Sequence, residues 1–255
     1  MEERKQKEIE YYDKKAGEFS GSGDFDGFDP RSLSSYKFLY SFLKDKCMDK
    51  KILDFGCGNG LHTVFLAENG GEVTAIDLSE NQLKIAKKRA EEAVLQRKIN
   101  FIKMDCENLE FPNQSFNVIF NSGTFSSIDL NKALPKLAKV LRRDGFLIGA
   151  ETFGHNPFAN LKRRLNKVAG RRTEWAAGHI LKMKDFKSAG DFFNKIEVHY
   201  FHLVSWLAFP FLRFSGGKLL LKLFELIDRI LLKAPFLRRY AFKVVFIFSE
   251  PKNEF

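Results

Sequence analysis

The sequence predicts an α/β fold in which a mostly parallel β-sheet carries helices on both faces. Three observations predict it. From about residue 50 onward, short apolar runs alternate with helical patterns. The runs would place apolar side chains on both faces of a strand, and the first run is joined to the first helix by glycines. With 255 residues and 44% hydrophobic content, the chain can fill one core, and we expect a single domain over 1–255.

The predicted elements follow one another as such a sheet requires. Strands are expected over 50–57, 72–78, 99–105, 116–122 and 145–152. Helices are expected over 61–69, 79–96 and 131–141. Ser79 and Gln82 have the spacing of a capping box, which predicts the start of the second of these helices.

The first glycines lie where a strand gives way to a helix, in LDFGCGNG. Gly56, Gly58 and Gly60 allow a tight turn and a close approach of a ligand to helix N–H groups. Asp77 and Asp105 end the next two strands, at the edge where open α/β sheets bind ligands, and Asp77 suits a ribose diol. The sequence therefore predicts a nucleotide site at this edge.

Four motifs in this order resemble those of class I S-adenosylmethionine-dependent methyltransferases: ILDFGCGNG, AIDLS, IKMDCENLEFPNQSFNVIF and LAKVLRRDGFLIGAE. The resemblance implies a Rossmann-like sheet of seven strands and S-adenosyl-L-methionine as cofactor. It also places a sixth strand at 195–204 and an antiparallel seventh at 242–250, inserted between strands 5 and 6. An NAD-type domain fits less well, because the third glycine comes one residue early for GxGxxG.

The resemblance implies roles for individual residues. Asp54 and Gly56 hold the amino acid end of the cofactor, Asp77 takes the ribose hydroxyls, and Asp105 accepts from the adenine amino group. Leu78 packs on the adenine, Asn121 and Ser122 line the methionine side, and Tyr12 belongs to a helix that closes over the site. The expected cofactor-binding residues are Tyr12, Asp54, Gly56, Cys57, Gly58, Asn59, Gly60, Asp77, Leu78, Asp105, Cys106, Asn121 and Ser122.

Two motifs that the sequence lacks narrow the range of atoms that could accept the methyl group. After the fourth strand there is no Asn/Asp-Pro-Pro-aromatic sequence, and there is no Pro-Cys pair for a cysteine nucleophile. O-methylation is favoured, while N-methylation of a simple amine and C-methylation remain open. His155 is the first candidate for a general base, His179 the second, and Glu151 could orient His155; a structural role is the alternative for each. The three cysteines have no metal-ligand spacing, and no metal is expected.

The basic residues are concentrated late in the chain. Residues 1–151 have a net charge of −1 and residues 152–245 one of +12, out of +10 overall. Because this region is also rich in Phe, an anionic membrane suits it better than bare nucleic acid, and a solvated basic face is the alternative. No run of 18 uncharged apolar residues exists, and the N-terminus is charged, so we expect a cytoplasmic protein, peripheral on the inner face of the membrane.

Two insertions are expected over the active site. Cap helices occupy 1–48 and the cofactor-binding core 49–152, while 153–185 and 205–241 leave from the carboxyl edge. The first insertion carries six cations: Lys162, Arg163, Arg164, Lys167, Arg171 and Arg172. In the second, residues 216–233 form an amphipathic helix whose charges share one arc, for which a membrane interface is favoured and a buried lid is the alternative.

These patterns lead to one main hypothesis and two alternatives. We expect methyl transfer to a hydrophobic or lipid-linked small molecule at a membrane surface. An RNA methyltransferase that uses the basic region is the first alternative, although nucleic acid is disfavoured. A cofactor-binding interaction protein without catalysis is the second. The sequence does not indicate an oligomeric state.

Overall fold

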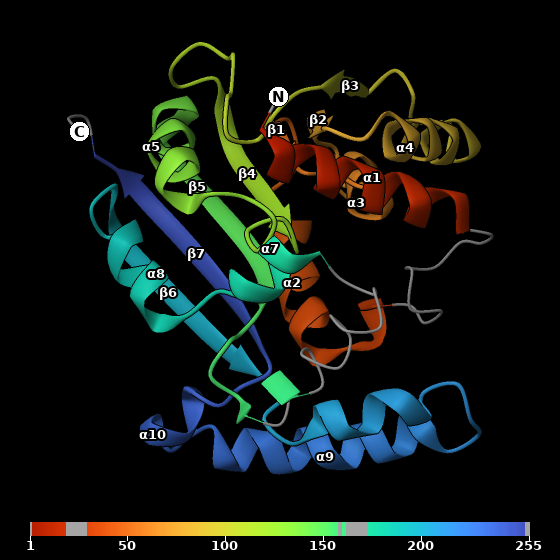
Figure 1. Cartoon of the computed structure of the whole chain (residues 1–255), viewed down its shortest axis with the longest axis vertical. Coiled ribbons are helices and arrows are strands. Elements are labelled where there is room, and N and C mark those ends of the chain that lie inside the picture. The colour runs from red at the N-terminus through yellow and green to blue at the C-terminus, as the bar shows by residue number, and fades with distance from the viewer. Residues whose placement is uncertain (1, 19–29, 158–159, 162–172, 253–255) are drawn as a thin grey trace.

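A seven-stranded sheet forms the centre of the computed structural model, which describes residues 2–18, 30–157, 160–161 and 173–252 (Figure 1). The strand order is β3-β2-β1-β4-β5-β7-β6, and only β7 runs antiparallel to its neighbours. The strands are β1 Lys51–Phe55, β2 Glu72–Asp77, β3 Ile99–Lys103, β4 Phe116–Ser122, β5 Leu141–Thr152, β6 Phe193–Phe201 and β7 Lys243–Pro251. The expected α/β fold, with an antiparallel seventh strand between strands 5 and 6, is confirmed.

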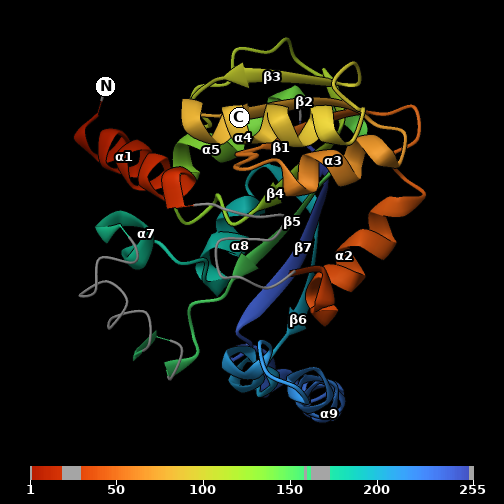
Figure 2. The ribbon, with the colours of Figure 1, turned by 90° about the vertical axis from the view of Figure 1, so that its right-hand side faces the viewer.

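Helices cover both faces of this sheet (Figure 2). The helices are α1 Glu3–Glu18, α2 Ser34–Lys44, α3 Leu61–Glu68, α4 Glu80–Glu92, α5 Leu130–Val140, α7 Glu174–Gly178, α8 Met183–Ala189, α9 Gly217–Leu231 and α10 Pro235–Arg238, with 3-10 turns η1 Pro30–Ser32 and η2 Ser205–Phe211. One hydrophobic cluster joins α2, α3 and α4 to the sheet, and the other joins α5 and α8 to its opposite face. The core is therefore two layers, one on each side of the strands.

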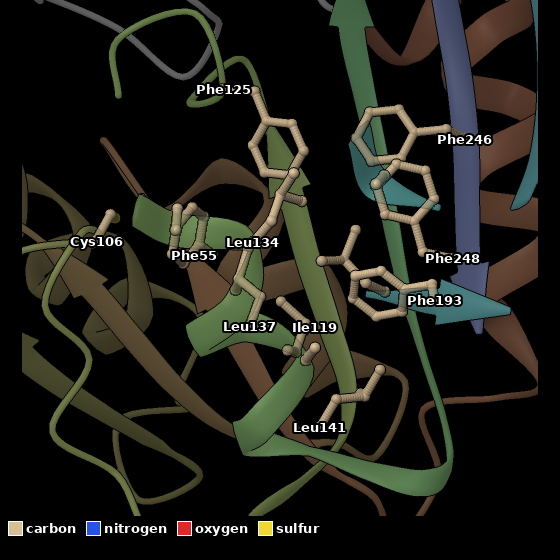
Figure 3. Packing of buried hydrophobic residues seen from close by; sticks show 14 of the residues in the cluster. Phe55, Cys106, Ile119, Phe125, Leu134, Leu137, Leu141, Phe193, Phe246 and Phe248 are labelled. Carbon is tan, nitrogen blue, oxygen red and sulfur yellow. The ribbon is translucent and has the colours of Figure 1, made fainter. Parts of the chain in front are cut away.

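The α5 side of the core is rich in aromatic rings (Figure 3). Phe125 packs on Phe246 with ring centroids 5.3 Å apart, and Phe246 stacks on Phe248 at 4.7 Å. Phe193, on the edge strand, packs on Phe248 at 5.4 Å. β7 supplies two of these rings, Phe246 and Phe248, which are two residues apart and therefore lie on the same face of the sheet.

Several expected element ends differ from the structure: the sixth strand ends at Phe201 rather than at residue 204, and α4 ends at Glu92 rather than at residue 96. β5 begins at Leu141 rather than at residue 145. The Ser79 hydroxyl caps α4 by accepting from the backbone N of Gln82, as expected, but Gln82 does not return the bond. Its side-chain amide instead donates to the carbonyl of Tyr12 at 3.0 Å, because α1 lies against α4. Ser79 is thus a cap without the reciprocal half of a capping box.

The two insertions leave the sheet at the carboxyl ends of β5 and β6. The first includes α7 and α8, whereas its six cations, at 162–164, 167, 171 and 172, lie outside the described residues. The second runs from η2 through α9 to α10 and lies beyond the end of β6 in both views (Figures 1 and 2). None of the described helices combines the length and the apolar character that crossing a bilayer requires.

The amphipathic helix α9 is oriented with two acids inward. Glu225 and Asp228 are 9% and 4% exposed, although both belong to the predicted charged arc. The carboxylate of Asp228 accepts from the backbone N of Val204 at 2.7 Å and of Ser205 at 3.2 Å. Much of the apolar arc faces outward instead: Leu219, Leu223, Leu226, Ile227 and Ile230 are 37–72% exposed. A wholly buried lid helix is therefore not what α9 forms.

Candidate functional site

A cavity of about 330 Å³ opens at the carboxyl ends of β1, β2 and β4. It is lined by all of the expected cofactor-binding residues except Gly60 and Asn121. Side chains of α1, α2 and the first residue of β7 complete its wall. The edge that the sequence predicted for a nucleotide therefore carries a cavity of small-molecule size.

The glycine loop after β1 is held against the end of β2. The backbone N–H groups of Gly56 and Cys57 donate to the carbonyl of Ile76 at 3.0 and 2.9 Å. Gly58 has a φ of +52°, and a Cβ there would meet nothing closer than 4.0 Å, so its backbone borders open space. Gly60, with a φ of +76°, packs instead against Ala86, where a Cβ would lie 2.7 Å away. Gly60 thus seats α3 against α4 and does not line the cavity.

Asp54 and Asp77, the two aspartates at this edge, are buried, and their pKa values are therefore higher than those of surface carboxylates. The carboxylate of Asp54 accepts from the Thr63 hydroxyl at 2.5 Å, and burial raises its pKa to about 7. Asp77 accepts from the backbone N of Gly58 and of Ser79, both at 2.9 Å, and burial raises its pKa too. Both carboxylates therefore gain from a cationic or hydrogen-bond-donating ligand in the cavity.

Helix α1 closes the cavity from above. Lys5 pairs with Asp105 at 2.7 Å, and Arg4 pairs with Glu107 at 2.6 Å. The hydroxyl of Tyr12 lies 3.2 Å from that of Ser127, in the loop after β4. The predicted closing helix therefore lies over the site, and the two cations that it contributes to the cavity, Arg4 and Lys5, are already paired with acids.

Two buried amide atoms at the cavity lack a hydrogen-bond partner among the described residues. They are the Nδ2 atom of Asn59 and the Oε1 atom of Gln82, and both residues line the cavity. Buried polar groups are usually satisfied, so these atoms point to a ligand with both an acceptor and a donor. A nucleoside with a ribose diol provides both.

The three candidate catalytic residues do not line the cavity. The Nε2 atom of His155 accepts from the backbone N of Met183 at 3.2 Å, and His179 is an exposed residue stacked on Trp175 at 3.6 Å. Glu151 is buried and accepts from the Asn121 amide at 2.9 Å and from the backbone N of Phe125 at 2.8 Å. Glu151 and Asn121 thus hold the loop after β4 in place. Any acid–base group at the cavity wall must therefore come from residues other than these three candidates.

Sequence reasoning missed Tyr36, His62 and Lys243, which line the cavity. The hydroxyl of Tyr36 lies 3.0 Å from the Ser122 hydroxyl and accepts from the Lys243 ammonium at 2.9 Å. The hydroxyl of Tyr40 lies 2.6 Å from the Nδ1 atom of His62. The available signal was the i, i+4 spacing of the two tyrosines, which places them on one face of α2.

Comparisons with known sequences agree with this site. Residues 52–145 match the family model described as a methyltransferase domain. The chain is similar to malonyl-[acyl-carrier protein] O-methyltransferase of Acetivibrio thermocellus, with 30% identity over 156 residues that cover 58% of this chain and 53% of the relative. It is also similar to the ubiquinone biosynthesis O-methyltransferase of Coxiella burnetii, with 32% identity over 123 residues, 48% of this chain and 49% of the relative. The chain spans about half the length of these relatives.

Solved structures share the fold. The geranyl diphosphate C-methyltransferase of Streptomyces coelicolor A3(2), in complex with Mg²⁺, geranyl diphosphate and S-adenosyl-L-homocysteine, has a TM-score of 0.63 at 14% identity and covers 97% of this chain and 98% of its own. The Haemonchus contortus phosphoethanolamine N-methyltransferase 2, in complex with S-adenosylhomocysteine, has a TM-score of 0.59 at 16% identity and covers 84% of this chain and 53% of its own. At these identities the likeness concerns the fold alone.

Proposed function

We propose that this chain, in which residues 52–145 match a methyltransferase domain, is a class I S-adenosylmethionine-dependent methyltransferase that methylates a hydrophobic or lipid-linked small molecule at an anionic membrane surface. S-adenosylmethionine supplies an electrophilic methyl group carried on a sulfonium. Asp54 would accept from its ammonium, Asp77 from its ribose, and the unpartnered atoms of Asn59 and Gln82 would meet its other polar groups. Oxygen is the favoured acceptor, and two relatives carry O-methyltransferase names.

The outward apolar face of α9 carries this proposal. Exposed apolar residues also flank the helix in the sequence: Leu207, Phe211 and Phe214 before it and Phe236 after it are 46–71% exposed. Many large apolar side chains exposed on one segment are typical of a membrane or protein contact. We define the α9 surface as these four residues together with Leu219, Leu223, Leu226, Ile227 and Ile230.

Charge favours lipid as the partner of the α9 surface. Between residues 203 and 241 the only acids are Glu225 and Asp228, and both point inward. Seven cations belong to the same segment: Arg213, Lys218, Lys222, Arg229, Lys233, Arg238 and Arg239. An apolar face flanked by cations matches a bilayer with anionic headgroups, and such a helix lies in the interface plane.

Flotation with vesicles that contain an anionic phospholipid tests this proposal. We expect the protein to float with them and a variant with Leu219→Ser, Leu223→Ser, Leu226→Ser and Ile230→Ser to stay at the bottom, because each leucine contributes about 1.5–3 kcal/mol on burial. Phe224 is left unchanged, since it packs against the core. The matched control is Val94→Ser, an exposed apolar position far from α9 in sequence. A parent protein that does not float contradicts the membrane part.

The enzymatic part is tested separately. We expect calorimetry to detect binding of S-adenosylhomocysteine. Mass spectrometry of lipid extracts from cells with and without the gene should reveal a species that differs by one CH₂. No binding of S-adenosylhomocysteine would overturn the methyltransferase assignment whatever the flotation result.

A further inference from the structure

Lys243 is a cation at the cavity without an acid partner among the described residues. The cavity is also lined by Arg4 and Lys5, and each of these is paired with a carboxylate at 2.6–2.7 Å. The ammonium of Lys243 instead donates to the Tyr36 hydroxyl at 2.9 Å and lies 4.2 Å from the centre of the Tyr36 ring. It is only partly exposed, so an anion beside it would offset the cost of its burial.

Tyr36 holds this ammonium in place rather than neutralising it. The ring of Tyr36 is 5% exposed and stacks on His62 with centroids 5.5 Å apart. Its hydroxyl is fixed by Ser122 at 3.0 Å, so both the hydroxyl and the ring face that Lys243 contacts are rigidly placed. A phenol leaves the charge of the ammonium intact and two of its hydrogens free to donate.

The sheet places Lys243 on the side of the cavity that is expected to hold the methionine end of the cofactor. Lys243 opens β7 and is the register partner of Thr152, at the carboxyl end of β5. Through Tyr36 it is connected to Ser122, at the carboxyl end of β4, which is expected on the methionine side of the cofactor. A substrate atom bound by Lys243 would therefore lie on the side of the cavity where the methyl group of the cofactor is expected.

We propose that Lys243, positioned by Tyr36, binds the carboxylate of an apolar acid, which makes the acceptor a carboxylate oxygen. This inference rests on the proposed function and names its substrate class. The oxygen enters as an anion and leaves as a methyl ester; its lone pair forms the O–CH₃ bond while the electron pair of the broken C–S bond stays on sulfur. Because the attacking carboxylate oxygen carries no proton, no proton changes hands and the chain needs no general base; the carboxylate and the sulfonium become a neutral ester and a neutral thioether.

Calorimetric titration with octanoate, octan-1-ol and octylamine, in the presence of S-adenosylhomocysteine, tests the proposal. We expect octanoate to bind at least about tenfold more tightly than the alcohol, since a hydrogen bond to a charged group is worth about tenfold or more. Lys243→Met should abolish this preference, Lys243→Arg should retain part of it, and Tyr36→Phe should weaken octanoate severalfold. The matched control is Lys187→Met, on the exposed surface of α8.

The readouts separate this proposal from the one it rests on. Thermal unfolding and retained binding of S-adenosylhomocysteine report that the variants are folded. The preference of each variant is the ratio of its octanoate and octan-1-ol affinities, so a change in the affinity for S-adenosylhomocysteine does not enter it. Equal binding of octanoate and octan-1-ol by the parent protein would overturn the carboxylate proposal, as would a Lys243→Met variant that keeps the preference. If the parent protein does not bind S-adenosylhomocysteine at all, the methyltransferase function itself is overturned instead.

Discussion

Glu225 caps a helix that lies far from it in the sequence: its Oε1 atom accepts from the backbone N of Ser34 at 2.8 Å. Ser34 is the first residue of α2, and the residue before it, Leu33, has no side-chain oxygen to offer. A carboxylate from α9 therefore supplies what a local Ser or Asp usually supplies at a helix N-terminus. Two residues further along α2, Tyr36 reaches the cavity.

Removing this cap should destabilise the protein. We expect Glu225→Ala to lower the free energy of unfolding by about 1–2 kcal/mol, because it leaves an orphan N–H in a largely buried place. Glu225→Gln should cost less, since the amide oxygen can still accept. Urea denaturation followed by circular dichroism measures both. Equal losses for the two variants would show that the bond to Ser34 contributes nothing.

The pH dependence of cofactor binding should follow Asp54. The pKa of this carboxyl is raised to about 7, so below that pH it is mostly protonated and cannot pair with an ammonium. The affinity for S-adenosylhomocysteine should therefore rise with pH by up to about tenfold per unit and level off above about pH 7. Calorimetry at successive pH values measures this. Asp54→Asn should bind more weakly with a flatter profile, and a profile as steep as that of the parent would assign the titration to another group.

The stability of the ligand-free protein should fall as pH rises, whereas the affinity for S-adenosylhomocysteine should rise with pH. In the unfolded chain Asp54 titrates near the ordinary aspartate pKa of 3.8, whereas in the folded protein it keeps its proton until about pH 7. The contribution of Asp54 to the free energy of unfolding is therefore fully present below about pH 4 and is lost as pH rises through about 7. Asp77 adds to it in the same direction, because burial raises its pKa as well. Thermal unfolding of the parent and of Asp54→Asn between these pH values should show the smaller slope in the variant.

Asp77→Ala should weaken S-adenosylhomocysteine by about tenfold or more, because the loss of a charged acceptor costs about 1.5–3 kcal/mol. Its carboxylate also holds the backbone N of Gly58, so the glycine loop loses an anchor as well. The comparison variant is Asp129→Ala, which removes a helix cap on α5 outside the cavity. An unchanged affinity in Asp77→Ala would remove Asp77 from the cofactor site.

Gly60 and Gly17 should respond oppositely to alanine. At Gly60 a Cβ would lie 2.7 Å from that of Ala86 at a φ of +76°, so Gly60→Ala should destabilise the protein by about 1–3 kcal/mol. Gly17 lies in α1 with nothing within 4 Å of its Cβ position, and Gly17→Ala should stabilise by up to about 1 kcal/mol. Thermal unfolding distinguishes the two. A neutral Gly60→Ala would mean that α3 and α4 can separate without cost.

The sheet and the glycine loop could be predicted because local patterns determine them. Gly56, Gly58 and Asp77 lie beside one another since successive strands of a parallel sheet end at the same edge. This rule also predicts that both insertions leave from that edge, but none of the described residues that line the cavity belongs to them. What it could not predict is a partner from another part of the chain, as Lys243 and Tyr36 show: they are separated by most of the sequence and meet only through β7 and α2.

The orientation of α9 could not be read from its periodicity. A helical wheel separates charged from apolar residues, but it does not say which side faces the protein. The inward side is set by the backbone N–H groups of Ser34, Val204 and Ser205, which Glu225 and Asp228 satisfy. Unsatisfied backbone donors of other segments therefore decide the rotation of this helix, and the sequence of α9 alone does not contain them.

Phe201 and Lys243 are register partners on neighbouring strands, so residues 202–242 depart from and return to one point of the sheet. β7 is held on both sides, by β5 and by β6, and its position does not depend on what connects it to β6. Apart from the cap that Glu225 provides to α2 and the core contacts of Ala208 and Leu221, the excursion is therefore an insertion that the pairing of β7 does not require. Replacing it with a short hairpin should leave Lys243 paired with β5, at the cost of the α2 cap, so the sheet that carries the cavity and the α9 surface are structurally separable.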